Sequence, residues 1–216
     1  MSRRASTPTV GLVTWSSVPP ADKNEDMGAD AAQVFSSLLA LAALAGAIVT
    51  AVALVASRAG LGWALEIVRL VRETGQWLVF AVTAGAMAGS LWFSERVGYV
   101  PCTLCWYQRI AMFSLAVLSL VAALRRDRGF SVYAIVAAAV GLAISSYHYL
   151  LEWFPQLETG VCSVAVPCNA VWFREFGFVT LAFMAGCAFL ATIVFSVVVR
   201  GGSLTGGSHG QQITTS

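Results

Sequence analysis

Two cysteines three positions apart, Cys102 and Cys105, stand in the stretch YVPCTLCWYQR, behind a proline and ahead of an apolar segment. A Cys-x-x-Cys pair can be a redox-active dithiol, an inert disulfide or half of a zinc site. Because the apolar segment begins at the motif, we expect Cys105 at or near a helix N-terminus. Exposed N–H groups and the helix dipole stabilise a thiolate there, and the thiolate is the nucleophile of disulfide exchange. The position therefore favours redox chemistry.

Arg109 lies one helical turn beyond Cys105, inside the same apolar segment. Placing an arginine in the middle of a membrane helix costs about 2.5–3.5 kcal/mol on insertion scales. Two interpretations remain open: the guanidinium extends to the membrane interface, or it faces the bundle interior and binds a polar group of a ligand beside Cys105. A quinone carbonyl suits the second interpretation, because its oxygen gains negative charge as electrons arrive.

A second cysteine pair, Cys162 and Cys168, lies in the loop FPQLETGVCSVAVPCNAVWFRE. Gly160 and Pro167 mark turns around it, and five intervening residues permit a small disulfide-closed loop. Such a loop can be a structural staple, and the two pairs together could supply four zinc ligands. If both pairs lie on the same membrane face, one exposed and one at a helix start, they are more typical of an electron relay.

His148, in SSYHYLLEW, is the remaining candidate side chain near the outer end of a span. A lone histidine there can be a hydrogen-bonded structural residue, but its depth matches that of Arg109, which favours a site role. Cys187 lies between Phe183 and Phe189, and a buried apolar thiol is the expected state.

The composition indicates which elements position these residues. The chain has 216 residues, of which 58% are hydrophobic and 11% are charged, whereas soluble domains carry about 25% charged residues. This deficit predicts an all-α integral membrane protein, and a net charge of +2 argues against a nucleic-acid partner. A bilayer core about 30 Å thick requires about 20 apolar residues per helix. We expect spans at 34–56, 77–93, 106–124, 130–151 and 176–199. Within the second, Gly85-x-x-x-Gly89 predicts a close helix–helix approach.

Arginine positions predict the orientation of the spans. One set of loops and ends carries most of the arginines and should be cytoplasmic, whereas the opposite loops carry only two. Both cysteine pairs then face outward, where disulfides persist. The first set is Arg58, Arg69, Arg72, Arg125, Arg126, Arg128 and Arg200; the second is Arg96 and Arg174.

Three segments lie outside the spans. Residues 1–33 and 201–216 are polar or rich in Gly, Ser and Thr, and we expect both to be disordered tails, extracytoplasmic and cytoplasmic respectively. Residues 57–75 place Leu61, Leu65 and Val68 on one helical face and Glu66 and Arg69 on another. This pattern fits an amphipathic cytoplasmic segment on the membrane surface, although an ordinary surface loop is an equal alternative.

PCTLCWYQR ahead of a span, SSYHYLLEW, and a cysteine pair before FGFVTLAF together resemble the disulfide bond formation protein B (DsbB) family, especially its BdbC-like branch. The resemblance covers roughly residues 77–199. It implies a four-helix bundle, here residues 76–200, with 34–56 as an additional N-terminal transmembrane helix. In the better-known branch a longer loop separates the second pair of cysteines.

The resemblance also implies a function. Members reoxidise an extracytoplasmic thioredoxin-like (DsbA-like) dithiol oxidase at the bacterial cytoplasmic membrane and pass electrons to a quinone, either ubiquinone or menaquinone. By correspondence, Cys105 would be the thiolate beside the quinone and Cys102 its partner. Arg109 and His148 would lie at the quinone, and Cys162 and Cys168 would be the loop pair, with Cys162 facing the partner.

Two other functions fit part of the pattern. A vitamin K epoxide reductase-like enzyme also combines a helical bundle with Cys-x-x-Cys and quinone, but there the quinone-facing pair follows the loop pair, whereas here it comes first. A non-catalytic membrane protein could use the cysteines as structural disulfides or metal ligands.

Overall fold

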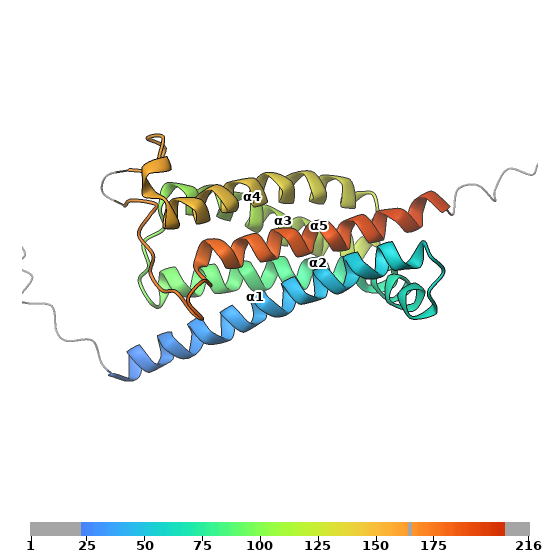
Figure 1. The fold of residues 1–216 in the computed structure, drawn as a ribbon, viewed down its shortest axis with the longest axis horizontal. Coiled ribbons are helices and arrows are strands. Elements are labelled where there is room, and N and C mark those ends of the chain that lie inside the picture. Colours follow the sequence, from blue (N-terminus) through green and yellow to red (C-terminus); the bar gives the residue numbers. More distant parts are fainter. Residues whose placement is uncertain (1–22, 164–165, 206–216) are drawn as a thin grey trace, which may run out of the picture.

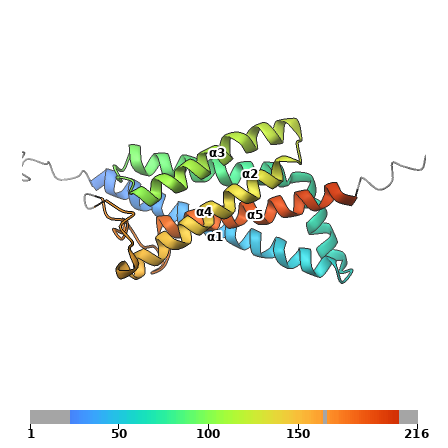
Figure 2. The same ribbon diagram turned by 90° about the horizontal axis from the view of Figure 1, so that it is seen from above.

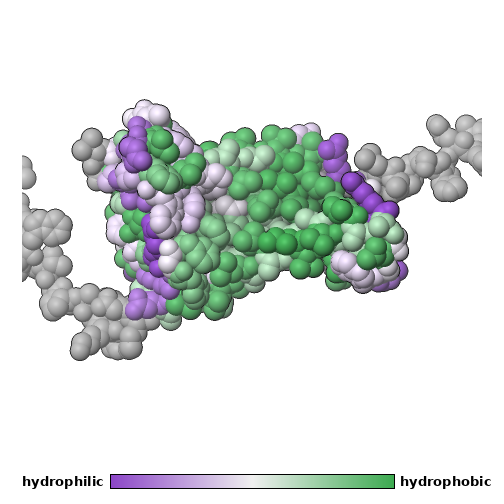
Figure 3. Space-filling model, in the orientation of Figure 1, coloured by the Kyte–Doolittle hydropathy of each residue, from purple (hydrophilic) through white to green (hydrophobic). Residues whose placement is uncertain are grey.

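The computed structural model describes residues 23–163 and 166–205, and within them the regular structure is helical apart from one isolated bridge. Five of its helices are long and apolar enough to cross a membrane. They run side by side along the long axis of the molecule (Figures 1 and 2), and an apolar band separates two polar ends (Figure 3). The all-α, multi-span prediction is confirmed. The elements are α1 (Lys23–Ser57), α2 (Gly62–Glu95), α3 (Thr103–Arg125), α4 (Phe130–Trp153), the 3-10 turn η2 (Pro155–Leu157) and α5 (Leu181–Thr205).

The first and last helices differ in extent from their predicted spans. Helix α1 starts at Lys23, so part of the predicted tail 1–33 is helical, while residues 1–22 lie outside the described ranges. Helix α5 starts only at Leu181 because Thr180 caps it, with Oγ1 accepting the N–H of Phe183 at 3.3 Å. It continues to Thr205, so the start of the predicted tail 201–216 is also helical, and 206–216 are not described.

The predicted amphipathic segment and the second span form one helix, α2. Figures 1 and 2 show its first turns crossing the end of the bundle at an angle to the rest. Leu61 and Leu65 are exposed, whereas Ala64, Val68 and Val71 are buried. Exposed leucines are what a helix lying on the membrane surface would present to lipid, so that interpretation of the segment stays a prediction. Ala64, Val68 and Val71 share one face of α2, and this face packs against α1 and α5.

Two clusters hold the helices together. Ala47 and Ala53 of α1 pack with Val79 of α2 and Phe195 of α5, so α1 is attached along much of its length. The second cluster joins α3, α4 and α5 around the fully buried ring of Phe189. This ring occupies the space that a Cβ on Gly141 would need, so Gly141 allows α4 and α5 to approach closely.

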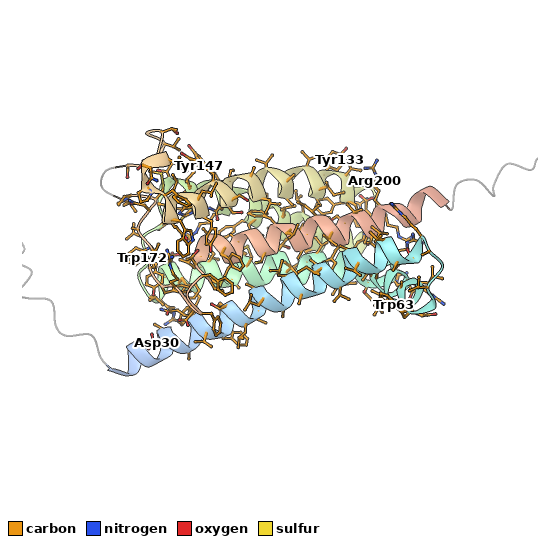
Figure 4. All side chains as sticks on the ribbon, in the orientation of Figure 1. Asp30, Trp63, Tyr133, Tyr147, Trp172 and Arg200 are labelled. Atoms are coloured by element: carbon orange, nitrogen blue, oxygen red, sulfur yellow. A yellow bond between two sulfur atoms is a disulfide. The ribbon has the colours of Figure 1, made fainter. Side chains whose placement is uncertain are left out.

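The α2–α3 and α4–α5 loops, which carry the cysteine pairs, lie at one end of the bundle, and the α1–α2 and α3–α4 loops lie at the other (Figure 1). Trp172 and Tyr147 mark the first end, and Trp63 and Arg200 mark the second (Figure 4). The arginine-bearing loops predicted to share a membrane side therefore do share an end of the molecule.

Candidate functional site

The inner cysteine pair lies at the start of α3. Cys102 is the N-cap residue, and its Sγ accepts the backbone N–H of Cys105 at 3.3 Å. The two sulfurs are 2.9 Å apart and are both free thiols in this structure. Such proximity allows the pair to interconvert between dithiol and disulfide with little backbone movement.

Hydrogen-bond donors converge on Cys102. Its pKa lies well below that of an ordinary thiol, chiefly because of the hydrogen bond with the Cys105 thiol and secondarily because of His148, while burial acts in the opposite direction. In the reduced pair the charge therefore favours Cys102, whereas the sequence predicted a thiolate at Cys105. The difference arises because the N-cap side chain, rather than a residue within the first turn, receives the exposed N–H groups.

His148 connects the inner pair to the outer loop. Its ring is buried, and the Gln108 Nε2 donates to Nδ1 at 2.8 Å. The proton then resides on Nε2, which lies 3.1 Å from the Cys168 carbonyl oxygen and 3.7 Å from Cys102 Sγ. Gln108 therefore sets the tautomer that can donate a hydrogen bond toward the sulfur. The site interpretation of His148 stays a prediction, now with defined contacts.

Arg109 extends across the bundle toward α2. Its Nε donates to Ser90 Oγ at 2.9 Å, and its Nη2 donates to the Ser90 carbonyl at 2.8 Å and to Ser94 Oγ. The guanidinium also lies 5.5 Å from the centre of the Trp106 ring. Of the two interpretations left open by the sequence, the geometry favours the interior one, because fixed partners hold the cation beside the site.

A cavity of about 420 Å³ opens next to Cys105, Gln108, Arg109 and His148. Cys102 lies on the other side and packs with Leu104, Leu151 and Cys168. The volume falls within the range of about 300–1,000 Å³ that is usual for small-molecule sites. Largely apolar walls with one cation and one histidine at the sulfur end fit a flat ring compound bearing a carbonyl oxygen, as a quinone does.

The predicted role of Gly85 and Gly89 in close helix packing is wrong. A Cβ on either residue would have no atom within 4 Å, and both residues line the cavity. Their missing side chains widen the cavity instead of joining two helices.

Cys162 and Cys168 form a disulfide in the α4–α5 loop. Cys168 is buried, at 1% exposure, and Cys162 is more exposed. Because the bond removes both thiolates, the four-cysteine zinc site considered from the sequence is not formed. Cys102, Cys105 and His148 remain a possible three-ligand set, with donor atoms within 4.8 Å of one another. Cys187 is buried in α5, as expected.

Several site residues were not anticipated from the sequence: Gln108, Ser90, Ser94, and the stacked pair of Tyr99 and Trp172, whose rings are 4.6 Å apart. Ser90 and Ser94 are four residues apart in an apolar helix, and this shared face was the signal that could have revealed them. Tyr99 and Trp172 come from different loops, so no local pattern joins them.

Comparison with known proteins places these features in a family. The family model of disulfide bond formation protein DsbB matches residues 72–199. A probable disulfide formation protein of Oceanobacillus iheyensis is 43% identical over 116 residues, covering 53% of this chain and 80% of that protein. Disulfide bond formation protein C of Bacillus subtilis is 37% identical over 135 residues, covering 62% and 95%. No solved structure matches.

Proposed function

Because the chain belongs to the DsbB family of disulfide bond formation proteins, we propose that it is a membrane protein-disulfide:quinone oxidoreductase. It reoxidises an extracytoplasmic, thioredoxin-like dithiol oxidase of the DsbA type at the bacterial cytoplasmic membrane. Helices α2–α5 act as the family's four-helix redox bundle, residues 76–200, and α1 is an additional span. The cysteine end faces outward, in keeping with the arginines at the opposite end.

One observation carries the proposal. Cys105 opens onto the cavity that Arg109 borders, whereas Cys102 packs beside Cys168 of the loop disulfide. The inner pair therefore has one sulfur toward the outer pair and one toward a small-molecule site, which is the arrangement that a relay needs.

The outer pair receives the electrons. A thiolate of the reduced partner attacks Cys162, the more exposed sulfur of the loop disulfide, and Cys168 leaves as a thiolate. Cys168 then attacks Cys102 of the oxidised inner pair, and Cys105 is released as a thiolate beside the cavity. Cys105 thus carries the charge at this stage, next to the cation of Arg109.

The partner's second thiolate then displaces Cys162 and leaves the partner oxidised. Cys162 attacks Cys168 to restore the loop disulfide, and Cys102 departs as a thiolate. The hydrogen bonds from Cys105 and His148 make Cys102 a good leaving group, because a thiol of lower pKa leaves faster. Two electrons now reside on the inner pair. A quinone in the cavity would supply the acceptor for both electrons and for two protons.

The test is quinone reduction by the purified protein in the presence of a reduced thioredoxin-like partner. Cys105→Ser should abolish turnover, whereas Cys187→Ser, which changes a cysteine outside the relay, should keep it. In sealed vesicles, an impermeant partner should be oxidised when the cysteine end faces the medium and not when the vesicles are inverted. A Cys105→Ser protein with the full rate of quinone reduction would contradict the proposal.

A further inference from the structure

Helix α1 lies before the region that the DsbB family model matches, yet it borders the cavity beside Cys105. We propose that α1 forms the outer wall of the quinone site and holds the isoprenoid tail of the quinone. The proposal rests on the function proposed above and adds a role for a helix that the sequence left without one.

The attachment of α1 supports this role. Gln33 and Ser37 are buried, at 8% and 0% exposure, on the face that meets α2 and α5. On the opposite face Phe35, Leu38 and Val52 are more than half exposed, as suits side chains in contact with lipid. A helix that served only as a membrane anchor would have no reason to bury polar side chains against the bundle.

The cavity-lining residues of α1 form a stripe. Ser36, Ala40 and Ala43 recur at three- and four-residue spacing and line the cavity together with Leu39, so the small residues share one helical face. Gly85 and Gly89 of α2 line the same cavity, and their Cβ positions meet no atom within 4 Å. Small residues on both walls leave room for a narrow hydrocarbon chain.

The cavity changes character along its length. Ser90 and Arg109 border it toward the cysteine end, and Ala81 and Ala43 border it farther into the bundle. The nine helical steps from Ala81 to Ser90 span roughly 13 Å. A polar head with an attached apolar tail matches this gradient: the ring oxygen lies at Arg109 and the tail passes between α1 and α2.

Helix α1 also contacts the aromatic side chains that line the cavity. Gln33 Nε2 donates to the Tyr99 hydroxyl at 2.8 Å, and the Tyr99 ring stacks between Phe93 and Trp172. Tyr99 and Trp172 both line the cavity. The same helix therefore provides the wall for the tail and a hydrogen bond that holds the aromatic pair near the sulfur end.

Photolabelling of the full-length protein in liposomes tests this assignment. Ubiquinone and menaquinone analogues with a diazirine on the isoprenoid tail should label the α1 peptide containing residues 36–43. Excess unmodified long-chain quinone should compete with the label. Analogues with the diazirine on the ring should label peptides containing Cys105, Arg109 or Ser90 instead.

A matched pair of variants supplies the second measurement. Ala40→Phe fills the wall, whereas Ala42→Phe adds the same ring on the exposed face of α1. Ala40→Phe should remove the α1 label and raise the KM for long-tailed quinone on the order of tenfold, as expected when several buried tail carbons lose their contacts. The KM for a short-tailed analogue should change much less, and Ala42→Phe should match wild type.

Two results would overturn the inference. One leaves the proposed function intact, and the other contradicts that function as well. If ring labelling is saturable but tail labels reach α2 or α5 and never α1, the wall assignment is wrong and the proposed function stands. If neither analogue labels any peptide saturably and no quinone is reduced, both are wrong. Labelling of the wild-type protein decides the question even if Ala40→Phe fails to fold.

Discussion

His148→Phe should raise the pKa of Cys102. The Nε2–H of His148 faces the Cys102 sulfur at 3.7 Å, and phenylalanine keeps the ring but removes the donor. A hydrogen bond to a charged group contributes about 1.5–3 kcal/mol. The long separation places this one at the lower end, and about 1.4 kcal/mol corresponds to roughly one pKa unit. We therefore expect the pKa to rise by about one unit.

The direction of the pH effect follows from the protonation state. A lowered pKa keeps Cys102 as thiolate above that pKa, and reactivity is lost as the pH falls through it. Loss of the donor therefore moves the pH of half-maximal alkylation upward. The assay is the iodoacetamide reaction rate of the reduced protein as a function of pH, with modification at Cys102 identified by mass spectrometry.

Two variants calibrate the measurement. Cys105→Ala removes the strongest contribution to the lowered pKa of Cys102, so its shift should exceed that of His148→Phe. Tyr149→Phe changes a neighbouring side chain whose hydroxyl donates to the Phe178 carbonyl instead, and it should cause no shift. An unchanged midpoint in His148→Phe, with the expected shift in Cys105→Ala, would refute the role assigned to His148.

Two further outcomes are expected. Arg109→Ala should raise the apparent quinone KM by roughly tenfold, the effect of losing one charge-assisted hydrogen bond; quinone titrations check this, with the exposed Arg96→Ala as control, and an unchanged KM would remove Arg109 from the site. Gly141→Ala should lower the free energy of unfolding by about 1–3 kcal/mol because the new methyl group meets the Phe189 ring. Gly85→Ala, which faces open space, should unfold near the wild-type temperature in detergent, and equal losses in both variants would contradict the packing described.

The proposed relay would account for the different surroundings of the two inner cysteines. In that proposal Cys102 needs a stabilised charge when it leaves, and it is the sulfur with hydrogen-bond donors around it. Cys105 would need access to an electron acceptor, and it is the one that lines the cavity. A single Cys-x-x-Cys motif can serve both purposes because its residues are the N-cap and the third residue of one helix and face different neighbours.

The sequence by itself determined the number of apolar spans and the Cys-x-x-Cys motif at the start of α3. It also determined that the loops carrying the cysteine pairs lie together and opposite most of the arginines. These features depend on hydropathy and charge summed over neighbouring residues, so they can be predicted from the sequence alone. The starts of α1 and α5 could not be predicted in this way, because a cap such as Thr180 and the buried Gln33 each act through a single contact.

Only the tertiary structure decided how the site is assembled. The contact of His148 with Cys102, the hydrogen bonds from Arg109 to Ser90 and the position of Ala40 at the cavity each join residues from different helices. Such contacts depend on how each helix is rotated about its axis, and packing against distant segments sets that rotation. The spacing of Gly85 and Gly89 predicted a close contact between two helices, but both residues line a cavity. The atoms that face a glycine depend on how the other helices pack around it.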